Sequence, residues 1–195
     1  NGTLENNLLR RDFTINAMAL SLQKDSYMEL IDMFNGMSDL KNKILKTPTD
    51  PNITFSDDPL RMLRAVRFAT RLDFEIDSAA LSAMKANANR MDILSKERIS
   101  GEFNKTLMTK KPSGGLKILR ECNMLKFILP NSKLLNDNQE TFDNVAYTVD
   151  VISSYDETLW MRWAGLMENE AKETIENIFK YLTISIDNMN YVTAL

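Results

Sequence analysis

Two residues of opposite charge, Asp58 and Arg61, stand three positions apart near the start of a helix-forming stretch that spans residues 55–74. Residues spaced by three share one helix face, so the carboxylate can accept and the guanidinium can donate hydrogen bonds side by side. Cytosine and adenine each place an amino group next to an acceptor ring nitrogen, whereas uracil and guanine reverse that order. Such a pair would select C and A without a nucleic-acid template, because a mismatched base leaves charged groups unpaired.

A stripe of arginines continues along the same stretch. Its members recur at spacings of three, three and four: Arg61, Arg64, Arg67 and Arg71. This spacing stacks guanidinium groups on one side of a helix, which suits phosphate groups. The alternative is a solvated basic face paired with nearby acids: Asp57, Asp58 and Glu75. The start of the helix, with Asp58 as N-cap and Pro59 at the first helical position, favours nucleotide reading.

A second polar group lies near the N-terminus, where Arg10 and Arg11 precede Asp12 in the sequence RRDFTINAMALSL. The run after Asp12 is compatible with a helix, and Asn16 would then lie on the same side as Asp12. A carboxylate and an amide in this arrangement can hydrogen-bond a ribose while an arginine holds phosphate. The alternative is an Asp N-cap with flanking salt bridges.

The elements that must position these residues change in type along the chain. Residues 1–7 are expected to be irregular, and residues 48–52 to form a linker. Between them the pattern predicts short strands, a turn and a short helix: strands near 19–22, 28–31 and 44–46, the turn at Asn35-Gly36, and the helix near 38–42. After residue 55 the pattern is helical: 78–87, 95–108, 112–122 and 124–129, followed by FDNVAYTVDVI and LWMRWAGLM. The expected fold class is α+β and predominantly α.

The composition is that of a folded chain without a broad basic surface. Of 195 residues, 44% are hydrophobic and 26% charged, and the formal net charge is −3. RNA binding would therefore depend on local patches such as the arginine stripe. One cysteine, Cys122, and no histidine exclude a disulfide framework and a zinc cluster, and Cys122 is expected to be a core residue. No signal peptide or membrane-length apolar run is present, which favours the cytoplasm.

Three motifs together resemble those of one enzyme family. RRDFTINAMA, DDPLRMLRAVRFA and KERISGEF are similar, in order and approximate spacing, to motifs of the class II tRNA nucleotidyltransferases, which are the CCA-adding enzymes, and of the related bacterial poly(A) polymerases. The family usually has Glu where Asp57 stands. The resemblance covers roughly residues 3–130.

The resemblance implies roles for individual residues. Arg11, Asp12 and Asn16 would bind the incoming nucleotide and favour ribose over deoxyribose. Asp58 and Arg61 would read the base, and the nucleotide-binding set extends along the stripe to Arg64 and Arg67. Charged residues of the third motif would brace the base-reading helix from behind: Glu97, Arg98 and Glu102.

The resemblance also implies a domain organisation. Residues 1–47 would be the C-terminal part of a mixed α/β nucleotidyltransferase head, 48–110 a helical, nucleobase-reading neck, and 111–195 a helical body. A segment containing Asp32, Gly36 and Asp39-Leu40 would be a flexible spring between head and neck, although an ordinary hairpin and turn fits the same residues. Many bacterial relatives carry an HD metal-hydrolase domain at the position of the body. Because this sequence has no histidine, that domain has either lost its chemistry or lacks residues near 131–141 and after Met167.

The implied activity is template-independent addition of C and A to the 3' end of tRNA, with CTP and ATP as substrates and Mg²⁺ as cofactor. The family's Mg²⁺-binding carboxylates precede RRDFTINAMA, so we expect the catalytic residues upstream of Asn1, and neither catalytic residues nor metal ligands within this sequence. The start at Asn1 without methionine indicates a missing N-terminus, with processing of the protein as the alternative explanation. Bacterial poly(A) synthesis is the nearest alternative. A non-catalytic RNA- or nucleotide-binding module applies if the chain is complete, and an HD-type phosphohydrolase is a third hypothesis.

Overall fold

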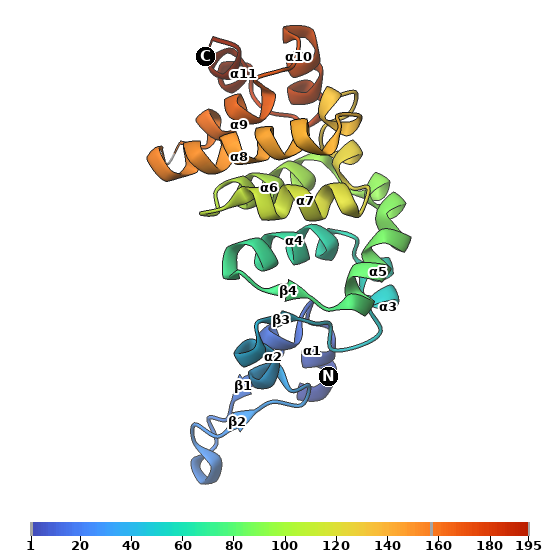
Figure 1. Cartoon of the computed structure of the whole chain (residues 1–195). Helices are drawn as coiled ribbons and strands as arrows, with labels where there is room; N and C mark the ends of the chain where they lie inside the picture. Colours follow the sequence, from blue (N-terminus) through green and yellow to red (C-terminus); the bar gives the residue numbers. More distant parts are fainter. Residues whose placement is uncertain (1, 157, 195) are drawn as a thin grey trace.

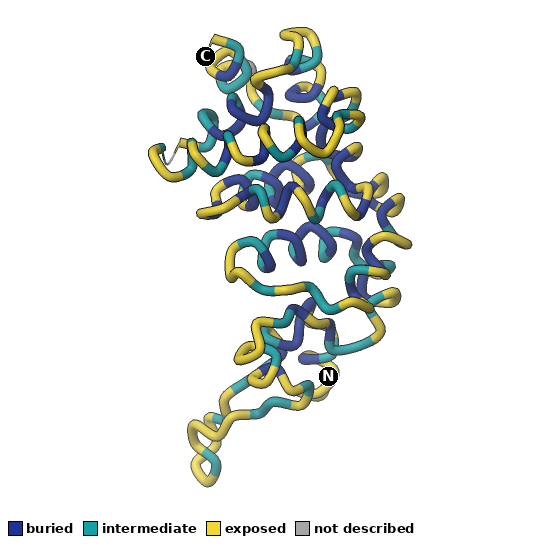
Figure 2. Tube along the Cα trace, viewed as in Figure 1, coloured by how far each residue is buried: buried dark blue, intermediate teal, exposed yellow. Residues whose placement is uncertain are grey.

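The computed structural model describes residues 2–156 and 158–194. The chain forms an elongated stack in sequence order, with a small mixed α/β piece at the N-terminal end and layers of helices above it (Figure 1). Buried residues lie along the inside of the helical layers, while the β1–β2 hairpin is mostly exposed (Figure 2). The fold is thus α+β and predominantly α, as the sequence predicts.

The N-terminal piece contains short elements only. They are the helices α1 (Leu4–Leu9) and α2 (Gly36–Asn42), the 3₁₀ turns η1 (Thr14–Asn16) and η2 (Lys24–Ser26), and the strands β1 (Ala19–Leu20), β2 (Leu30–Ile31) and β3 (Ile44–Leu45). The β1–β2 pair is antiparallel, with Ala19 opposite Ile31. Two expectations are wrong here. Residues 1–7 were expected to be irregular, but residues 4–9 are helical because Thr3 caps them by accepting the Asn6 N–H. The run after Asp12 was expected to be helical, but it makes only one 3₁₀ turn before β1.

Helix α2 is fixed to η1 by a set of local contacts. Asp32 accepts the N–H groups of Gly36 at 2.7 Å and Met37 at 2.9 Å, and the Thr14 hydroxyl donates to Asp39 at 2.6 Å. Gly36 is buried, and a Cβ there would lie 2.3 Å from the Thr14 carbonyl oxygen. The helix of the segment expected to act as a spring is therefore capped at its N-terminal end by Asp32 and fixed on one side to Thr14.

Alanine at Gly36 is expected to lower the free energy of unfolding by about 1–3 kcal/mol, because backbone must move to accept the methyl group. Urea denaturation measures this loss. Gly101→Ala is the matched control: a Cβ at Gly101 meets no atom within 4 Å, so that helical substitution should be neutral or stabilising. Equal stability of Gly36→Ala and the wild type would contradict the close approach of α2 to η1.

The junction between the N-terminal piece and the helices contains two elements that were not predicted. Helix α3 (Pro51–Asp57) replaces the expected linker, with Asp50 as its N-cap and Pro51 in its first turn. Strand β4 (Glu75–Ile76) returns to pair in parallel with β3, with Ile44 opposite Glu75. The central helix α4 (Leu60–Leu72) lies between them in sequence. The N-terminal piece is thereby tied to both ends of α4.

The elements of the helical part are α5 (Ser78–Asn87), η3 (Ala88–Ile93), α6 (Lys96–Leu107), α7 (Pro112–Glu121), η4 (Leu125–Phe127), η5 (Lys133–Leu135), α8 (Gln139–Tyr155), α9 (Leu159–Met167), α10 (Lys172–Tyr181) and α11 (Ile186–Ala194). The helical part follows the predicted pattern in α5, α6, α7 and α9, whereas the helix predicted over 124–129 is only a 3₁₀ turn and α10 and α11 were not predicted. Helix α4 packs on α6 and α7, and α7 packs on α8. Cys122 is fully buried, as expected of a core residue, and burial raises the pKa of its thiol to about 11.

Helix α9, which carries the Arg-Trp-Ala sequence, connects the last layers to α6. The Trp163 ring is fully buried, contacts Phe103 edge-on at 5.2 Å between centroids, and donates its N–H to Asn104 at 2.8 Å. The buried Arg162 guanidinium donates to the carbonyl oxygens of Leu107 at 2.6 Å and Thr109 at 2.8 Å. These contacts assign both side chains a packing function.

None of the helices in the described part of the chain is both long and apolar enough to cross a membrane.

Candidate nucleotide-binding site

Asp12 lies at the centre of the junction between the N-terminal piece and α4. Its side chain is 7% exposed, and one carboxylate oxygen accepts two hydrogen bonds, from the Asn16 amide at 3.1 Å and from the Phe13 N–H at 3.0 Å. The other oxygen receives Arg64, with Nε at 2.7 Å and Nη2 at 2.6 Å. Two motifs separated by 52 positions therefore meet at one carboxylate. Asp12 and Asn16 do face each other, although one 3₁₀ turn and not a helix connects them.

Aromatic packing holds this meeting point in place. Phe13 is buried and contacts Phe68 of α4 edge-on, with 5.8 Å between ring centroids. The guanidinium carbons of Arg67 and Arg64 lie 4.2 Å and 5.5 Å from the centre of the Phe68 ring. Such cation–π contacts orient guanidinium groups as well as attracting them. Phe68 thus fixes both the docking of the N-terminal piece and the direction of two arginines.

Asp58 and Arg61 lie at the N-terminal end of α4, one turn before Arg64. Asp58 Oδ1 accepts the Leu60 N–H at 3.2 Å and lies 3.4 Å from Arg98 Nη2, while Arg61 Nη2 donates to the Arg10 carbonyl oxygen at 2.6 Å. The side chains of Asp58 and Arg98 are 37% and 51% exposed. An ion pair this long and this exposed is weak. An incoming hydrogen-bonding edge could therefore replace Arg98 at low cost.

Arg67 is more enclosed than Arg64, whose side chain is 34% exposed. The Arg67 side chain is 11% exposed and donates through Nε to Glu102 Oε2 at 2.7 Å, while Lys105 Nζ reaches Glu102 Oε1 at 2.9 Å. Glu102 is itself buried. The structure thus places Arg67 and Glu102 as a bridge between α4 and α6 directly behind the site.

Only two of the three residues expected to brace the base-reading helix, Glu97, Arg98 and Glu102, contact the nucleotide-binding residues. Arg98 and Glu102 contact Asp58 and Arg67 respectively. Glu97 is exposed and faces its own helix start. There a hydrogen bond from its own backbone N–H, followed by one from Ser95, lowers the pKa of its carboxyl.

The partners of the arginine stripe differ from those named in the ion-pair alternative. Arg64 and Arg67 pair with Asp12 and Glu102, which come from distant segments, and not with Asp57, Asp58 or Glu75. Arg11 is exposed beside Asp12 in sequence. The stripe therefore combines internal ion pairs with groups that face solvent.

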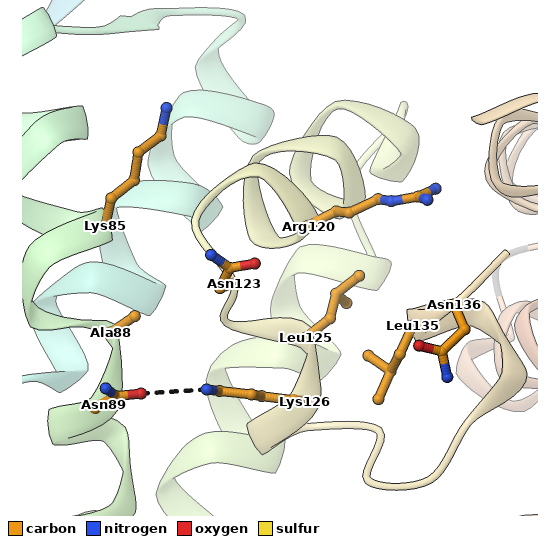
Figure 3. A pocket seen from close by; sticks show the side chains of 9 residues that line it. All are labelled: Lys85, Ala88, Asn89, Arg120, Asn123, Leu125, Lys126, Leu135 and Asn136. Atoms are coloured by element: carbon orange, nitrogen blue, oxygen red, sulfur yellow. Dashed lines mark hydrogen bonds between the residues drawn. The ribbon is translucent and has the colours of Figure 1, made fainter. Parts of the chain in front are cut away.

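A separate hollow of about 580 Å³ lies between α5, the end of α7 and residues 125–136 (Figure 3). The sequence reasoning missed this hollow because no motif marks it. Its cations are already engaged: Lys85 with Glu121 at 2.7 Å, Lys126 with Asn89 at 3.2 Å, and Arg120 with the Asp137 carbonyl oxygen. Of these cations only Lys85 is paired with a carboxylate, and the other two contact neutral oxygens.

The described residues hold no group of three or more His, Cys, Asp or Glu side chains placed to share a metal ion. The carboxylates in and beside the site, Asp12, Asp58 and Glu102, each lie against an arginine. The residues present therefore do not fit a Mg²⁺ site. Their side chains instead provide hydrogen-bond donors and acceptors of the kinds that suit a base, a ribose and phosphates.

Two family models match the chain. The poly(A) polymerase head domain matches residues 1–46, and the probable RNA- and SrmB-binding site of polymerase A matches residues 73–135. The chain is thus similar to a poly(A) polymerase head domain at its N-terminal end and to the probable RNA-binding site of polymerase A in its helical part. The CCA-adding enzyme of Limosilactobacillus reuteri (strain DSM 20016) is 47% identical over 115 residues, which cover 59% of this chain and 28% of that protein. The CCA-adding enzyme of Ligilactobacillus salivarius is 32% identical over 193 residues, covering 98% and 45%.

Solved structures of tRNA-processing enzymes are also similar to this chain. A tRNA nucleotidyltransferase complexed with a primer tRNA and an incoming ATP analog superposes with a TM-score of 0.79 at 26% identity, covering 99% of this chain and 58% of that one. A tRNA-processing enzyme with CTP gives 0.77 at 27% identity, covering 97% and 53%. The chain belongs to the class II tRNA nucleotidyltransferase and bacterial poly(A) polymerase family. It spans less than half the length of the two curated relatives.

Proposed function

We propose that the protein is a template-independent nucleotidyltransferase that adds C and A to the 3' end of tRNA, using CTP and ATP. The observation that carries this proposal is the convergence of Asp12, Arg64 and Asp58-Arg61 on one end of α4. The relatives named CCA-adding enzyme and the structural neighbours bound to tRNA, an ATP analog and CTP support the same substrates.

In the proposed site, each group acts on a different part of the nucleotide. The Asp58 carboxylate accepts from the amino group of cytosine or adenine, and Arg61 donates to the adjacent ring nitrogen. To do so Asp58 exchanges its 3.4 Å contact with Arg98, and Arg61 leaves the Arg10 carbonyl oxygen. Arg98 and Glu102 act by positioning, Arg98 on Asp58 and Glu102 through Arg67. Glu97 belongs to the same proposed support.

The ribose and phosphates are assigned to the remaining residues. Asp12 and Asn16 are proposed to hydrogen-bond the ribose hydroxyls, and Arg11 and Arg64 to meet the phosphates, with Arg67 completing the nucleotide-binding set. We further propose the division into head (1–47), neck (48–110) and body (111–195). Mg²⁺, which nucleotidyl transfer uses to stabilise the transferring phosphoryl group, would be held by residues other than those described here.

Alanine at Asp12 is expected to reduce the preference for ATP over dATP about ten-fold, because one charged hydrogen bond to a ribose hydroxyl is lost. Single-turnover incorporation of both nucleotides measures the preference. Asp25→Ala, an exposed acid in η2, is the control and should keep the wild-type ratio. An unaltered ratio in Asp12→Ala would show that Asp12 has no part in ribose choice.

The proposed function is that of the whole protein, so the test incubates the full-length protein with a tRNA that lacks its 3' CCA and with CTP, ATP or both. We expect CMP incorporation with CTP, AMP incorporation only after CMP, and no extension with UTP or GTP. The second candidate is poly(A) synthesis, which the polymerase A family models favour. Long AMP tails on unrelated RNA, with no use of CTP, would replace the first proposal by the second.

A further inference from the structure

The end of α10 meets the start of α6, although the two residues in contact are 85 positions apart in sequence. Lys96 Nζ donates to the Tyr181 hydroxyl oxygen at 2.6 Å and lies 4.4 Å from the centre of the Tyr181 ring. Tyr181 is half-buried and packs against the hydrophobic core. An ammonium group that contacts both the hydroxyl and the face of one ring has little freedom of direction. The C-terminal helices therefore hold the first turn of α6 at a defined point.

Buried aromatic rings fix α10 relative to α6. Phe179 contacts Trp163 of α9 edge-on at 5.1 Å between centroids, and Trp163 contacts Phe103 of α6 in the same way at 5.2 Å. All three side chains are buried, and rings packed at interior density transmit position with little slack. Helix α6 itself lies between α4 and the C-terminal layers (Figure 1). Tyr181, two residues after Phe179, is thus held on a rigid support.

The turn after α10 reaches the same part of α6. Thr183 has a φ of 56°, and among the described residues it is the only β-branched one with a positive φ. This conformation is unfavourable for a β-branched side chain, so the surrounding structure must hold it there. The pKa of the Glu97 carboxyl is lowered first by its own N–H, then by Ser95, and further by the Thr183 hydroxyl. The end of α10 therefore lies against both Lys96 and Glu97.

The first turn of α6 also carries the contact to the proposed base-reading residue. Arg98 follows Lys96 by two positions, which places the two side chains on opposite sides of the turn. Arg98 Nη2 lies 3.4 Å from Asp58 Oδ1, and a shift of the turn by about 0.2 Å would lose this hydrogen bond. The same Asp58 oxygen accepts the Leu60 N–H at 3.2 Å. The direction of the Asp58 carboxylate therefore depends on where the first turn of α6 lies.

We propose that Tyr181 is a positioning residue for base selection: it holds the first turn of α6 through Lys96, and Arg98 on that turn keeps Asp58 directed toward an incoming base. The half-exposed Asp58 side chain would otherwise sample several rotamers, and fixing its direction beforehand reduces the cost of ordering it on binding. Selectivity depends on that direction, because the same oxygen attracts an amino group and repels a carbonyl oxygen. This inference rests on the proposed function, since it takes Asp58 as the base reader.

The test removes only the Tyr181 hydroxyl, in the full-length protein. For Tyr181→Phe we expect the ratio of kcat/KM for CTP to that for UTP, on a tRNA that lacks its 3' CCA, to fall about three- to ten-fold. The fall should come from a higher KM for CTP with nearly unchanged kcat. Lys96→Met removes the donor of the same hydrogen bond and should give the same loss. Tyr191→Phe, at an exposed tyrosine of α11, is the matched control and should keep the wild-type ratio.

A double-mutant cycle separates positioning from packing. If Tyr181 acts through Arg98, the loss caused by Tyr181→Phe should disappear in an Arg98→Ala background, because the connection is already broken there. An unchanged ratio in Tyr181→Phe and Lys96→Met would overturn the inference, as would an equal loss with and without Arg98. If selectivity then still fell in Asp58→Ala, the proposed function would stand. A wild-type protein that used CTP and UTP equally would contradict the proposed function together with this inference.

Discussion

Alanine at Asp58 is expected to relax nucleotide choice, raising incorporation of UMP and GMP relative to CMP and AMP about ten- to hundred-fold. The carboxylate accepts a hydrogen bond that cytosine and adenine can donate, and a lost base contact of this kind is worth about 1–3 kcal/mol of discrimination. Without the carboxylate, uracil and guanine no longer place a carbonyl oxygen against a negative charge. The ratio is measured with each nucleotide in turn on a tRNA that lacks its 3' end.

Arg61→Ala is expected to have a similar effect through the other half of the pair, because it removes the donor to the ring nitrogen. The control is Asp92→Ala, an exposed acid in η3, which should preserve both rate and selectivity. Loss of rate in Asp58→Ala and Arg61→Ala with an unchanged preference for C and A would contradict base reading by this pair and leave it a structural role only.

Removal of the Glu102 carboxylate is expected to cost the largest amount of stability. Glu102→Ala leaves the Arg67 guanidinium, whose side chain is 11% exposed, without its 2.7 Å partner between α4 and α6. Breaking a buried ion pair from one side costs about 3–5 kcal/mol. Chemical denaturation measures the change, and we expect it near that range.

Two further variants separate the buried charge from ordinary packing. Lys105→Gln removes only the exposed partner of Glu102, so the loss should stay below about 1 kcal/mol. Arg67→Met combined with Glu102→Leu removes both buried charges, and we expect it to recover most of the stability lost in Glu102→Ala. A Glu102→Ala protein as stable as Lys105→Gln would contradict the bridge.

The sequence predicts those parts of the site that depend on local spacing. Asp58 and Pro59 mark the start of α4, and a separation of four brings Asp12 and Asn16 into contact. The apolar periodicity after residue 55 predicts α5, α6, α7 and α9 within one residue of their observed ends, and α8 within three. The helix starts and ends follow from apolar periodicity and capping, and the Asp12–Asn16 contact follows from a single 3₁₀ turn; all are properties of neighbouring residues.

The parts that could not be predicted depend on distant contacts. No local pattern indicates that Arg64 pairs with Asp12 or that Arg67 pairs with Glu102. Strands β3 and β4 contain two residues each, and only their mutual pairing makes them strands. Helix α3 is different, because its signal was present: Asp50 followed by Pro51 is a good helix start that the linker interpretation overlooked.

The central claim, that the end of α4 reads the base, is tested most directly by the equilibrium binding of the four nucleoside triphosphates to the wild-type protein. Isothermal titration calorimetry without RNA measures each affinity before any incorporation step. We predict that CTP and ATP bind at least about ten-fold more tightly than UTP and GTP, and that the difference disappears in Asp58→Ala. Equal affinity of the wild-type protein for all four nucleotides would contradict base reading by Asp58 and Arg61.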